Sequence, residues 1–160
     1  MTTETADGAA QVRAIRIELE IPINAPCERV WAALIDEIGV WWPKDFYVTP
    51  EPGQITLEAR AGGRLFERGR SGSELLWFTV IAIDPGKSMD LVGSLTPAYG
   101  GPATTMLHLE LEPHGDGATL FKVADDIFGH IGEKLRSIED GWRIIFHDNF
   151  KAFVERPAGG

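Results

Sequence analysis

Residues 130–155 read HIGEKLRSIEDGWRIIFHDNFKAFVE, and they decide the fold. Core-type residues recur there at three- and four-residue steps, the spacing of one face of an α-helix. A helix of this length extends about 37 Å at 1.5 Å per residue, so it must lie across something nearly as long. The stripe runs through Ile131, Leu135, Ile138, Trp142, Ile145, Asn149 and Ala152, and Phe146 and Phe153 widen it.

The sequence before this helix alternates between apolar and polar residues, as half-buried β-strands do. The first strand is predicted over residues 12–23, and Asn24-Ala25-Pro26 then opens two short helices that end at Pro43. Strands segregated from helices indicate an α+β fold, in which a curved antiparallel β-sheet wraps around the long C-terminal helix. The remaining strands are predicted at 54–59, 64–68, 74–83, 89–95, 104–112 and 118–125.

The composition is that of one folded domain, predicted over residues 12–155 between tails at 1–11 and 156–160. The net charge of −9 argues against binding to nucleic acid or to an anionic membrane, which needs clustered Lys and Arg. Cys27 is the only cysteine, so no internal disulfide forms. Because the chain shows neither a membrane-spanning apolar run nor a signal-peptide pattern, we expect a cytoplasmic protein.

Four local patterns resemble those of a known family. They are Pro26 with Val30-Trp31, Leu34 and Trp41-Trp42-Pro43; Gly62-Gly63-Arg64 with Glu67-Arg68; Trp77 with Val80 and Asp84-Pro85; and Gly141-Trp142 followed by Phe150, Lys151, Phe153 and Glu155. With the order of predicted elements, they resemble the Bet v 1-like (START/SRPBCC) superfamily and its helix-grip fold. Within it, the chain is most similar to the branch named after the activator of the Hsp90 ATPase, and the resemblance spans residues 15–155.

The resemblance implies more than one kind of activity. Members of the superfamily mostly bind apolar small molecules in a cavity between the sheet and the C-terminal helix. Some are cyclases, dehydratases or hydrolases, and the namesake of the branch is a co-chaperone that stimulates Hsp90. A shared fold therefore does not by itself fix what this chain does.

Glu67 is the carboxylate with the strongest claim to a role in such a cavity. Alternation places Leu65 and Glu67 on one face of the 64–68 strand, so Glu67 faces the cavity if Leu65 does. Burial there would raise the pKa of a carboxyl group and suit it to accept a proton or orient a ligand. The alternatives are that Glu67 pairs with an arginine of a neighbouring strand or reaches water at the strand end.

The other predicted wall residues are apolar, with one exception. Asn149 lies on the helix stripe and is a second polar contact, unless the stripe is rotated to run through Phe146, Phe150 and Phe153, which moves Asn149 to the flank. Gly141 is expected to let the sheet backbone or a bulky side chain approach the helix. The predicted apolar wall comprises Trp41 or Trp42, Leu65, Trp77, Met106 or Leu107, Phe121, Trp142 and Phe146.

The adjacent residues Trp41 and Trp42 are predicted not to face the same core. At least one of them should line a cleft, belong to a second layer or form a partner surface. A homodimer through an edge strand or Trp42, and a chaperone partner at the tryptophan pair, are open alternatives.

Motifs for other chemistry are missing from the sequence. The four histidines lack the spacing of a metal site, and no serine lies in a Gly-x-Ser-x-Gly elbow. The glycine-rich segments lack the Lys and Ser/Thr of a phosphate loop, so no cofactor or metal is predicted. The sequence favours binding of an apolar or amphipathic small molecule. The alternatives are an enzyme of the cyclase/dehydratase type that uses Glu67, and a co-chaperone-like interaction domain.

Overall fold

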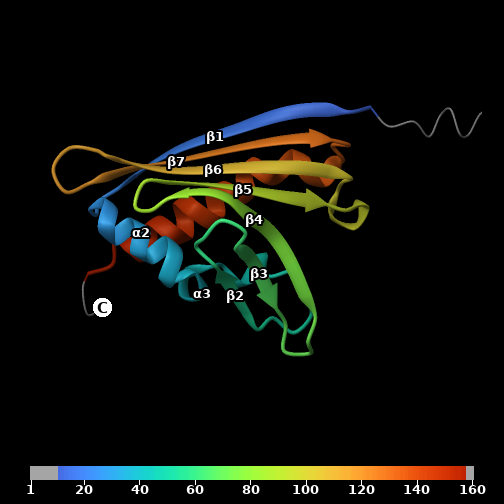
Figure 1. The fold of residues 1–160 in the computed structure, drawn as a ribbon, viewed down its shortest axis with the longest axis horizontal. Coiled ribbons are helices and arrows are strands. Elements are labelled where there is room, and N and C mark those ends of the chain that lie inside the picture. The colour runs from blue at the N-terminus through green and yellow to red at the C-terminus, as the bar shows by residue number, and fades with distance from the viewer. Residues whose placement is uncertain (1–10, 158–160) are drawn as a thin grey trace, which may run out of the picture.

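Seven antiparallel strands form one curved sheet, and the C-terminal helix lies across its inner face (Figure 1). The computed structural model describes residues 11–157, without the side chains of Lys134 and Arg136. Residues 1–10 and 158–160 of the predicted tails lie outside this range. In the described part of the chain, no helix has both the length and the apolarity needed to span a bilayer.

The sheet follows the predicted meander, with strand order β1-β7-β6-β5-β4-β3-β2. The first strand pairs with the last because the chain returns to it after the meander, from Arg13 opposite Gly129 to Ile23 opposite Thr119. The strands are β1 (Arg13–Ile23), β2 (Gln54–Leu57), β3 (Arg64–Arg68), β4 (Glu74–Asp84), β5 (Ser88–Leu95), β6 (Ala103–Pro113) and β7 (Thr119–Gly129).

Short helices connect some of these strands. The predicted pair between the first two strands is confirmed as α2 (Cys27–Asp36) and α3 (Ile38–Trp41), followed by one turn of 3₁₀ helix, η1 (Lys44–Phe46). Pro26 fits the start of α2 because a proline N–H is not needed there. A second 3₁₀ turn, η2 (Pro97–Tyr99), separates β5 from β6.

The predicted C-terminal helix is confirmed as a continuous helical run over residues 133–154, with two local differences. Its first turn is the 3₁₀ segment η3 (Glu133–Ser137), which leads into α4 (Ile138–Trp142). The next nine residues, η4 (Arg143–Lys151), form a wider π-helix, and α5 (Ala152–Val154) ends the run. Periodicity alone does not distinguish these short segments from an α-helix, because the repeat of each differs from that of an α-helix by less than one residue per turn.

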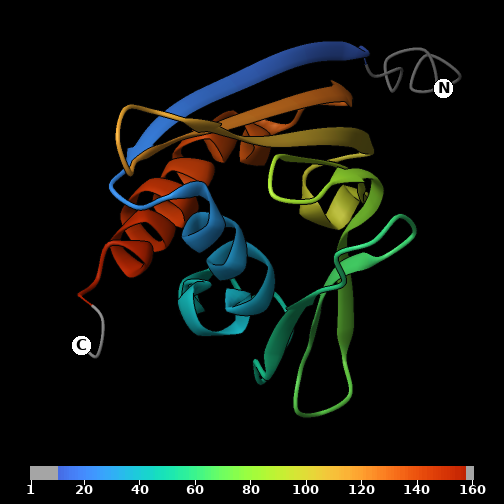
Figure 2. The same ribbon diagram turned by 60° about the vertical axis from the view of Figure 1, so that its left-hand side comes forward.

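The sheet bends strongly at β4, so that β2 and β3 turn away from β1 and β7 (Figure 2). Two irregularities in strand pairing account for the bend. Leu65 and Phe66 lie opposite Phe78 and Leu76, which leaves Trp77 as an extra residue of β4. The pairing with β5 shifts again between Val80 and Ala82. Such β-bulges bend a strand and increase its twist.

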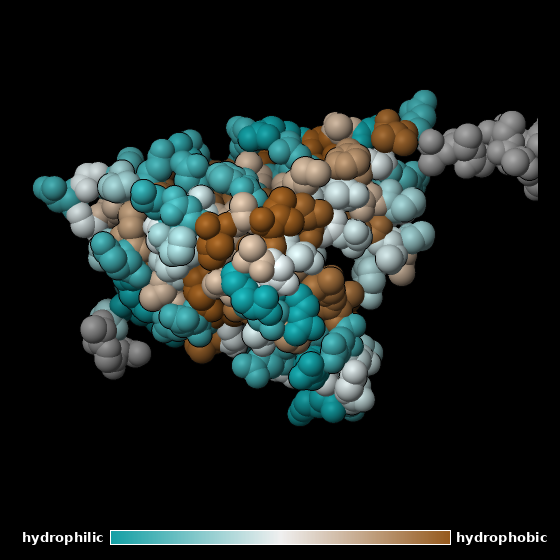
Figure 3. Space-filling view, viewed as in Figure 1, coloured by the Kyte–Doolittle hydropathy of each residue, from teal (hydrophilic) through white to brown (hydrophobic). Residues whose placement is uncertain are grey.

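The interior lies between the concave face of the sheet and the helices, and it is lined by the apolar positions that alternation predicts. Leu107, Leu109 and Leu111 of β6 all lie at or below 4% exposure, whereas Met106 is 45% exposed on the outer face. Figure 3 shows apolar side chains reaching the surface near the middle of the face in view, framed by polar ones.

The last strand is longer than predicted. It continues from Asp125 to Gly129, and the buried Ile127 keeps the inward alternation. The two consecutive acids, Asp125 and Asp126, point to opposite faces of β7, and the inward Asp125 is fully buried.

Candidate functional site: an apolar pocket beside two tryptophans

A pocket of about 370 Å³ lies between the N-terminal part of the C-terminal helix and two residues from other elements, Phe46 of η1 and Trp77 of β4. This volume falls in the range of small-molecule sites, which begins at about 300 Å³. Most of the described residues around it are apolar, and Asp140 is the charged one among them. The lining consists of Phe46, Trp77, Ser137, Ile138, Asp140, Gly141, Trp142, Ile144 and Ile145.

Trp77 is fixed in the pocket wall by Glu67. Its indole N–H donates to Glu67 Oε2 over 2.8 Å, and the edge of its ring meets Trp42 with centroids 5.3 Å apart. Trp77 is the extra residue of the β4 bulge. Its side chain therefore does not have to point to the opposite face of the sheet from the inward-facing Phe78, as strict alternation would require. The bulge also explains Gly93 of β5, since a Cβ there would lie 2.5 Å from the Trp77 carbonyl oxygen.

Glu67 is fully buried, and its carboxylate is occupied by donors from the protein itself. Besides Trp77, it accepts hydrogen bonds from the backbone N–H groups of Val48 and Thr49, the shortest at 2.8 and 2.6 Å, and from the Thr49 hydroxyl at 2.7 Å. The predicted inward orientation of Glu67, on the same face as Leu65, is therefore what the structure has. Its hydrogen-bond partners are backbone, hydroxyl and indole donors, and the carboxylate holds residues 48 and 49 against the sheet.

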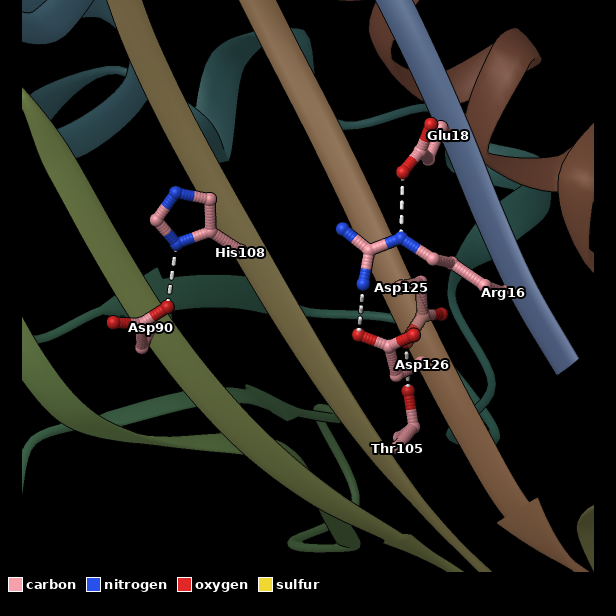
Figure 4. Close-up of polar contacts among 7 residues, drawn as sticks. All are labelled: Arg16, Glu18, Asp90, Thr105, His108, Asp125 and Asp126. Atoms are coloured by element: carbon pink, nitrogen blue, oxygen red, sulfur yellow. Dashed lines mark hydrogen bonds and ion pairs between the residues drawn. The ribbon is translucent and has the colours of Figure 1, made fainter. Parts of the chain in front are cut away.

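Trp142 is held in a corresponding way by Asp125. Its indole N–H donates to Asp125 Oδ2 over 2.8 Å, and the Thr105 hydroxyl donates to Oδ1. Burial raises the pKa of Asp125, and the bonds from Thr105 and Trp142 offset this only in part. Two buried carboxylates of the sheet thus orient the two tryptophans of the pocket (Figure 4 shows Asp125 with Thr105).

Gly141 allows Phe46 of η1, which forms one wall of the pocket, to approach the helix. A Cβ at this position would lie 3.5 Å from Cε1 of Phe46, which is ordinary van der Waals contact. The bulky side chain predicted to approach the helix at Gly141 is therefore Phe46, which belongs to η1 and not to the sheet. The Phe46 carbonyl also accepts the indole N–H of Trp42 at 3.3 Å, which ties this wall to the end of α3.

Most of the other predicted wall residues pack against one another instead of lining this pocket. Trp41, Phe121, Phe146 and Phe150 form a group that we call the aromatic column, with neighbouring ring centroids 4.7 to 6.3 Å apart. Phe121 and Phe150 have no exposed surface. The column fills the interior at the C-terminal part of the helix, and Trp142 stacks on Phe146 at the boundary with the pocket, with centroids 5.4 Å apart.

The structure shows where the side chains lie for two alternatives left open above, Met106 or Leu107 and the position of Asn149. Leu107 faces the interior at 2% exposure, whereas Met106 lies on the outer face of the sheet. Asn149 is at the flank of the buried stripe, and its side-chain amide donates to the Ile144 carbonyl at 2.7 Å. Of the predicted set, the structure brings only Trp77 and Trp142 to the pocket.

The prediction that Trp41 and Trp42 cannot share a core is wrong. Both are buried, at 5% and 4% exposure, in the same apolar cluster. Helix α3 ends at Trp41, and Trp42 has extended backbone angles, so the two rings diverge within the interior. Trp41 joins the aromatic column and Trp42 packs on Trp77, so neither ring offers an exposed partner surface.

Some residues of the site were missed from the sequence. Asp125 could have been found, because Phe121, Val123, Asp125 and Ile127 alternate along one face of β7. Phe46 could not, because it lies in a Pro-flanked connection without periodicity, and only the folded chain brings it to Gly141.

A second polar group lies on the outer face of the sheet, away from the pocket (Figure 4). His108 Nδ1 lies 2.5 Å from Asp90 and Nε2 lies 3.2 Å from Glu110, while Arg16 bridges Glu18 and Asp126. Burial lowers the pKa of His108, but the bonds and charges of Asp90 and Glu110 outweigh it and raise the pKa overall. Among the described residues, no three His, Cys, Asp or Glu side chains gather so as to hold a metal ion.

Comparison with known proteins supports the sequence resemblance. The model of a family described as activator of Hsp90 ATPase homolog 1-like protein matches residues 24–155. This range includes every residue of the pocket. No curated protein matches the chain significantly.

Solved structures with low sequence identity share the fold. A protein from Rhizobium leguminosarum is 18% identical, with a TM-score of 0.66 over 93% of this chain and 99% of that one. A protein from Chromobacterium violaceum is 23% identical, with a TM-score of 0.60 over 89% and 98%. The protein Ara h 8.0201 is 17% identical, with a TM-score of 0.62 over 89% and 98%. These likenesses establish the helix-grip architecture.

Proposed function

Because the chain belongs to the family of activator of Hsp90 ATPase homolog 1-like proteins, we propose that it binds a predominantly apolar small molecule in the pocket beside Trp77 and Trp142. The sequence resemblance implied small-molecule binding or a chaperone interaction, and membership of the family is compatible with both. The pocket is the observation that favours the first.

One observation carries this proposal. The two tryptophans of the pocket are fixed by hydrogen bonds to buried carboxylates, at 2.8 Å each, without any contribution from a ligand. A site whose side chains are already ordered loses little conformational entropy when a ligand enters. The walls are aromatic and aliphatic, so the free energy of binding comes mainly from removing apolar surface from water.

The proposal is one of binding without chemistry. General acid–base catalysis needs polar groups within hydrogen-bond reach of the reacting atoms. Glu67, the predicted candidate, directs its carboxylate at Trp77 and the 48–49 backbone. Asp125 is engaged by Thr105 and Trp142. Either carboxylate would have to give up these bonds before it could act on a ligand.

Gly141 offers the sharpest test. Gly141→Leu would extend a side chain into the pocket, whereas Gly141→Ala adds one methyl group at ordinary contact distance from Phe46. Both substitutions favour the helix by up to about 1 kcal/mol, and urea unfolding of each variant separates lost binding from a loss of stability caused by contact with Phe46. Isothermal titration calorimetry with indole, 2-naphthol and 4-tert-butylphenol should show binding to the wild type and Gly141→Ala, and none to Gly141→Leu.

Two outcomes would overturn the proposal. One is the absence of binding by the wild type to all three compounds. The other is equal binding by Gly141→Leu, which would place the ligand elsewhere. In the first case, a pull-down with purified Hsp90 would test the chaperone interaction directly.

A further inference from the structure

The charges and rings around the pocket narrow the class of ligand. We propose that the ligand is an organic cation, with an ammonium group carried on an apolar body. This inference rests on the proposed function, because it concerns the same pocket.

Among the described side chains of the lining, the charge has one sign. Asp140 is the charged residue among them, and no described Lys, Arg or His belongs to the lining. Arg143, the next cation along the helix, is 3.4 Å from Glu139 and is partly neutralised by it. The whole chain carries a net charge of −9. An anion would therefore enter against repulsion, whereas a cation is attracted both at long range and at the pocket.

The aromatic rings provide the second argument. Phe46, Trp77 and Trp142 all line the pocket, and the face of an aromatic ring carries negative electrostatic potential that attracts ammonium groups. The positive edge of an indole is at its N–H group. Here the N–H of Trp77 and of Trp142 point at Glu67 and Asp125, so these edges are already bonded within the sheet.

Glu67 strengthens the same preference. It is fully buried, and its carboxylate accepts hydrogen bonds from two backbone N–H groups, the Thr49 hydroxyl and the Trp77 indole. A hydrogen bond to an anion increases the electron density of the indole that donates it. The negative charge also acts on the pocket through protein rather than water, where electrostatic attraction is less screened.

Three probes of nearly equal shape separate charge from size. They are 4-(trimethylammonio)phenol, 4-tert-butylphenol and 4-hydroxybenzenesulfonate, which carry a cationic, a neutral and an anionic group on the same ring. By calorimetry, we expect the wild type to bind the ammonium compound about tenfold more tightly than the tert-butyl compound. The sulfonate should not bind detectably.

Asp140→Asn tests whether the preference arises in the pocket. It keeps the shape of the side chain and should weaken binding of the cation about threefold more than it changes binding of 4-tert-butylphenol. Asp148→Asn removes the same charge from the exposed side of the same helical run, outside the lining. It should change neither affinity.

The outcomes distinguish failure of the cation inference from failure of the proposed small-molecule binding. If the neutral compound binds as tightly as the cation, the pocket is a binding site but the cation inference is wrong. The inference is also wrong if Asp148→Asn weakens cation binding as much as Asp140→Asn, because the effect then belongs to the net charge. If none of the probes used in either experiment binds, the proposed function fails with it.

Discussion

The indole N–H of Trp77 donates to Glu67 Oε2 over 2.8 Å, and this bond joins two neighbouring strands through side chains that alternation alone would not bring together. Glu67 lies opposite Leu75, and the bulge at Trp77 then shifts the register of β4 before Phe78 pairs with Leu65. The bond fixes a pocket wall, and the same carboxylate holds the segment that follows Phe46. The hydrogen bond between Trp77 and Glu67, which we call the anchor, thus lies at the bend of the sheet and also fixes the shape of the pocket.

We expect substitutions of Glu67 and Trp77 to have non-additive effects on the free energy of unfolding. Glu67→Gln places amide hydrogens against existing donors and should cost about 2 to 3 kcal/mol, and Trp77→Phe should cost about 1 to 2 kcal/mol. The double variant should lose at least about 1 kcal/mol less than the sum. Urea unfolding of the four proteins measures this, with Thr49→Val as a control that removes only the hydroxyl bond. Strict additivity would show that the bond contributes nothing to stability.

The two faces of β6 should respond differently to truncation. Leu107→Ala is expected to destabilise the fold by about 2 to 5 kcal/mol, because it leaves a cavity beneath the helix. Met106→Ala on the outer face should change stability by no more than about 0.5 kcal/mol. Thermal and urea unfolding of this matched pair checks the strand orientation. Similar losses in both variants would mean that β6 is turned over.

Alternation and periodicity were sufficient to predict the sheet, the paired short helices and the C-terminal helix. They succeed because each of these elements has one buried face along most of its length. They failed at Trp41-Trp42, where the chain leaves helix α3 between the two residues and both rings turn inward. The end of β7 was predicted four residues early, at Asp125, although the buried Ile127 continues the inward alternation to Gly129.

Asp125 should make stability depend on pH. Burial raises its pKa above the ordinary 3.8, so folding favours the protonated carboxyl. That contribution is complete below the unfolded pKa and is lost as pH rises through the folded pKa. Asparagine mimics the neutral form, so the stability of Asp125→Asn relative to wild type should increase above about pH 4 and then level off. Urea unfolding across this range tests it, and a difference independent of pH would contradict the expectation.

His108 should titrate above its ordinary pKa of 6.5, because Asp90 and Glu110 together outweigh the burial that lowers its pKa. A raised pKa means that protonation stabilises the fold. This contribution is present below about pH 6.5 and is lost as pH rises through the folded value. NMR titration of the imidazole gives the pKa directly. Asp90→Asn should lower it, whereas an unchanged midpoint would remove Asp90 as the cause.

The candidate site was predictable only where a single strand decides the direction of a side chain. The inward orientation of Glu67 followed from its alternation with Leu65, and the structure has both residues buried. The partners of Glu67 did not follow, because Val48 and Thr49 lie in a connection that only tertiary packing brings to β3. The bulge that directs Trp77 depends on the register of three strands and leaves no local pattern in the sequence.

The aromatic column and the pocket divide the space under the helix into two regions with separate tasks. Trp41, Phe121 and Phe150 secure the helix to the sheet at one end, while Ile138, Gly141 and Ile144 face the pocket at the other. If the proposed binding holds, substitutions at the second group alter what is bound without loosening the first. Ligand preference could then diverge among relatives of this chain while their folded architecture stays the same.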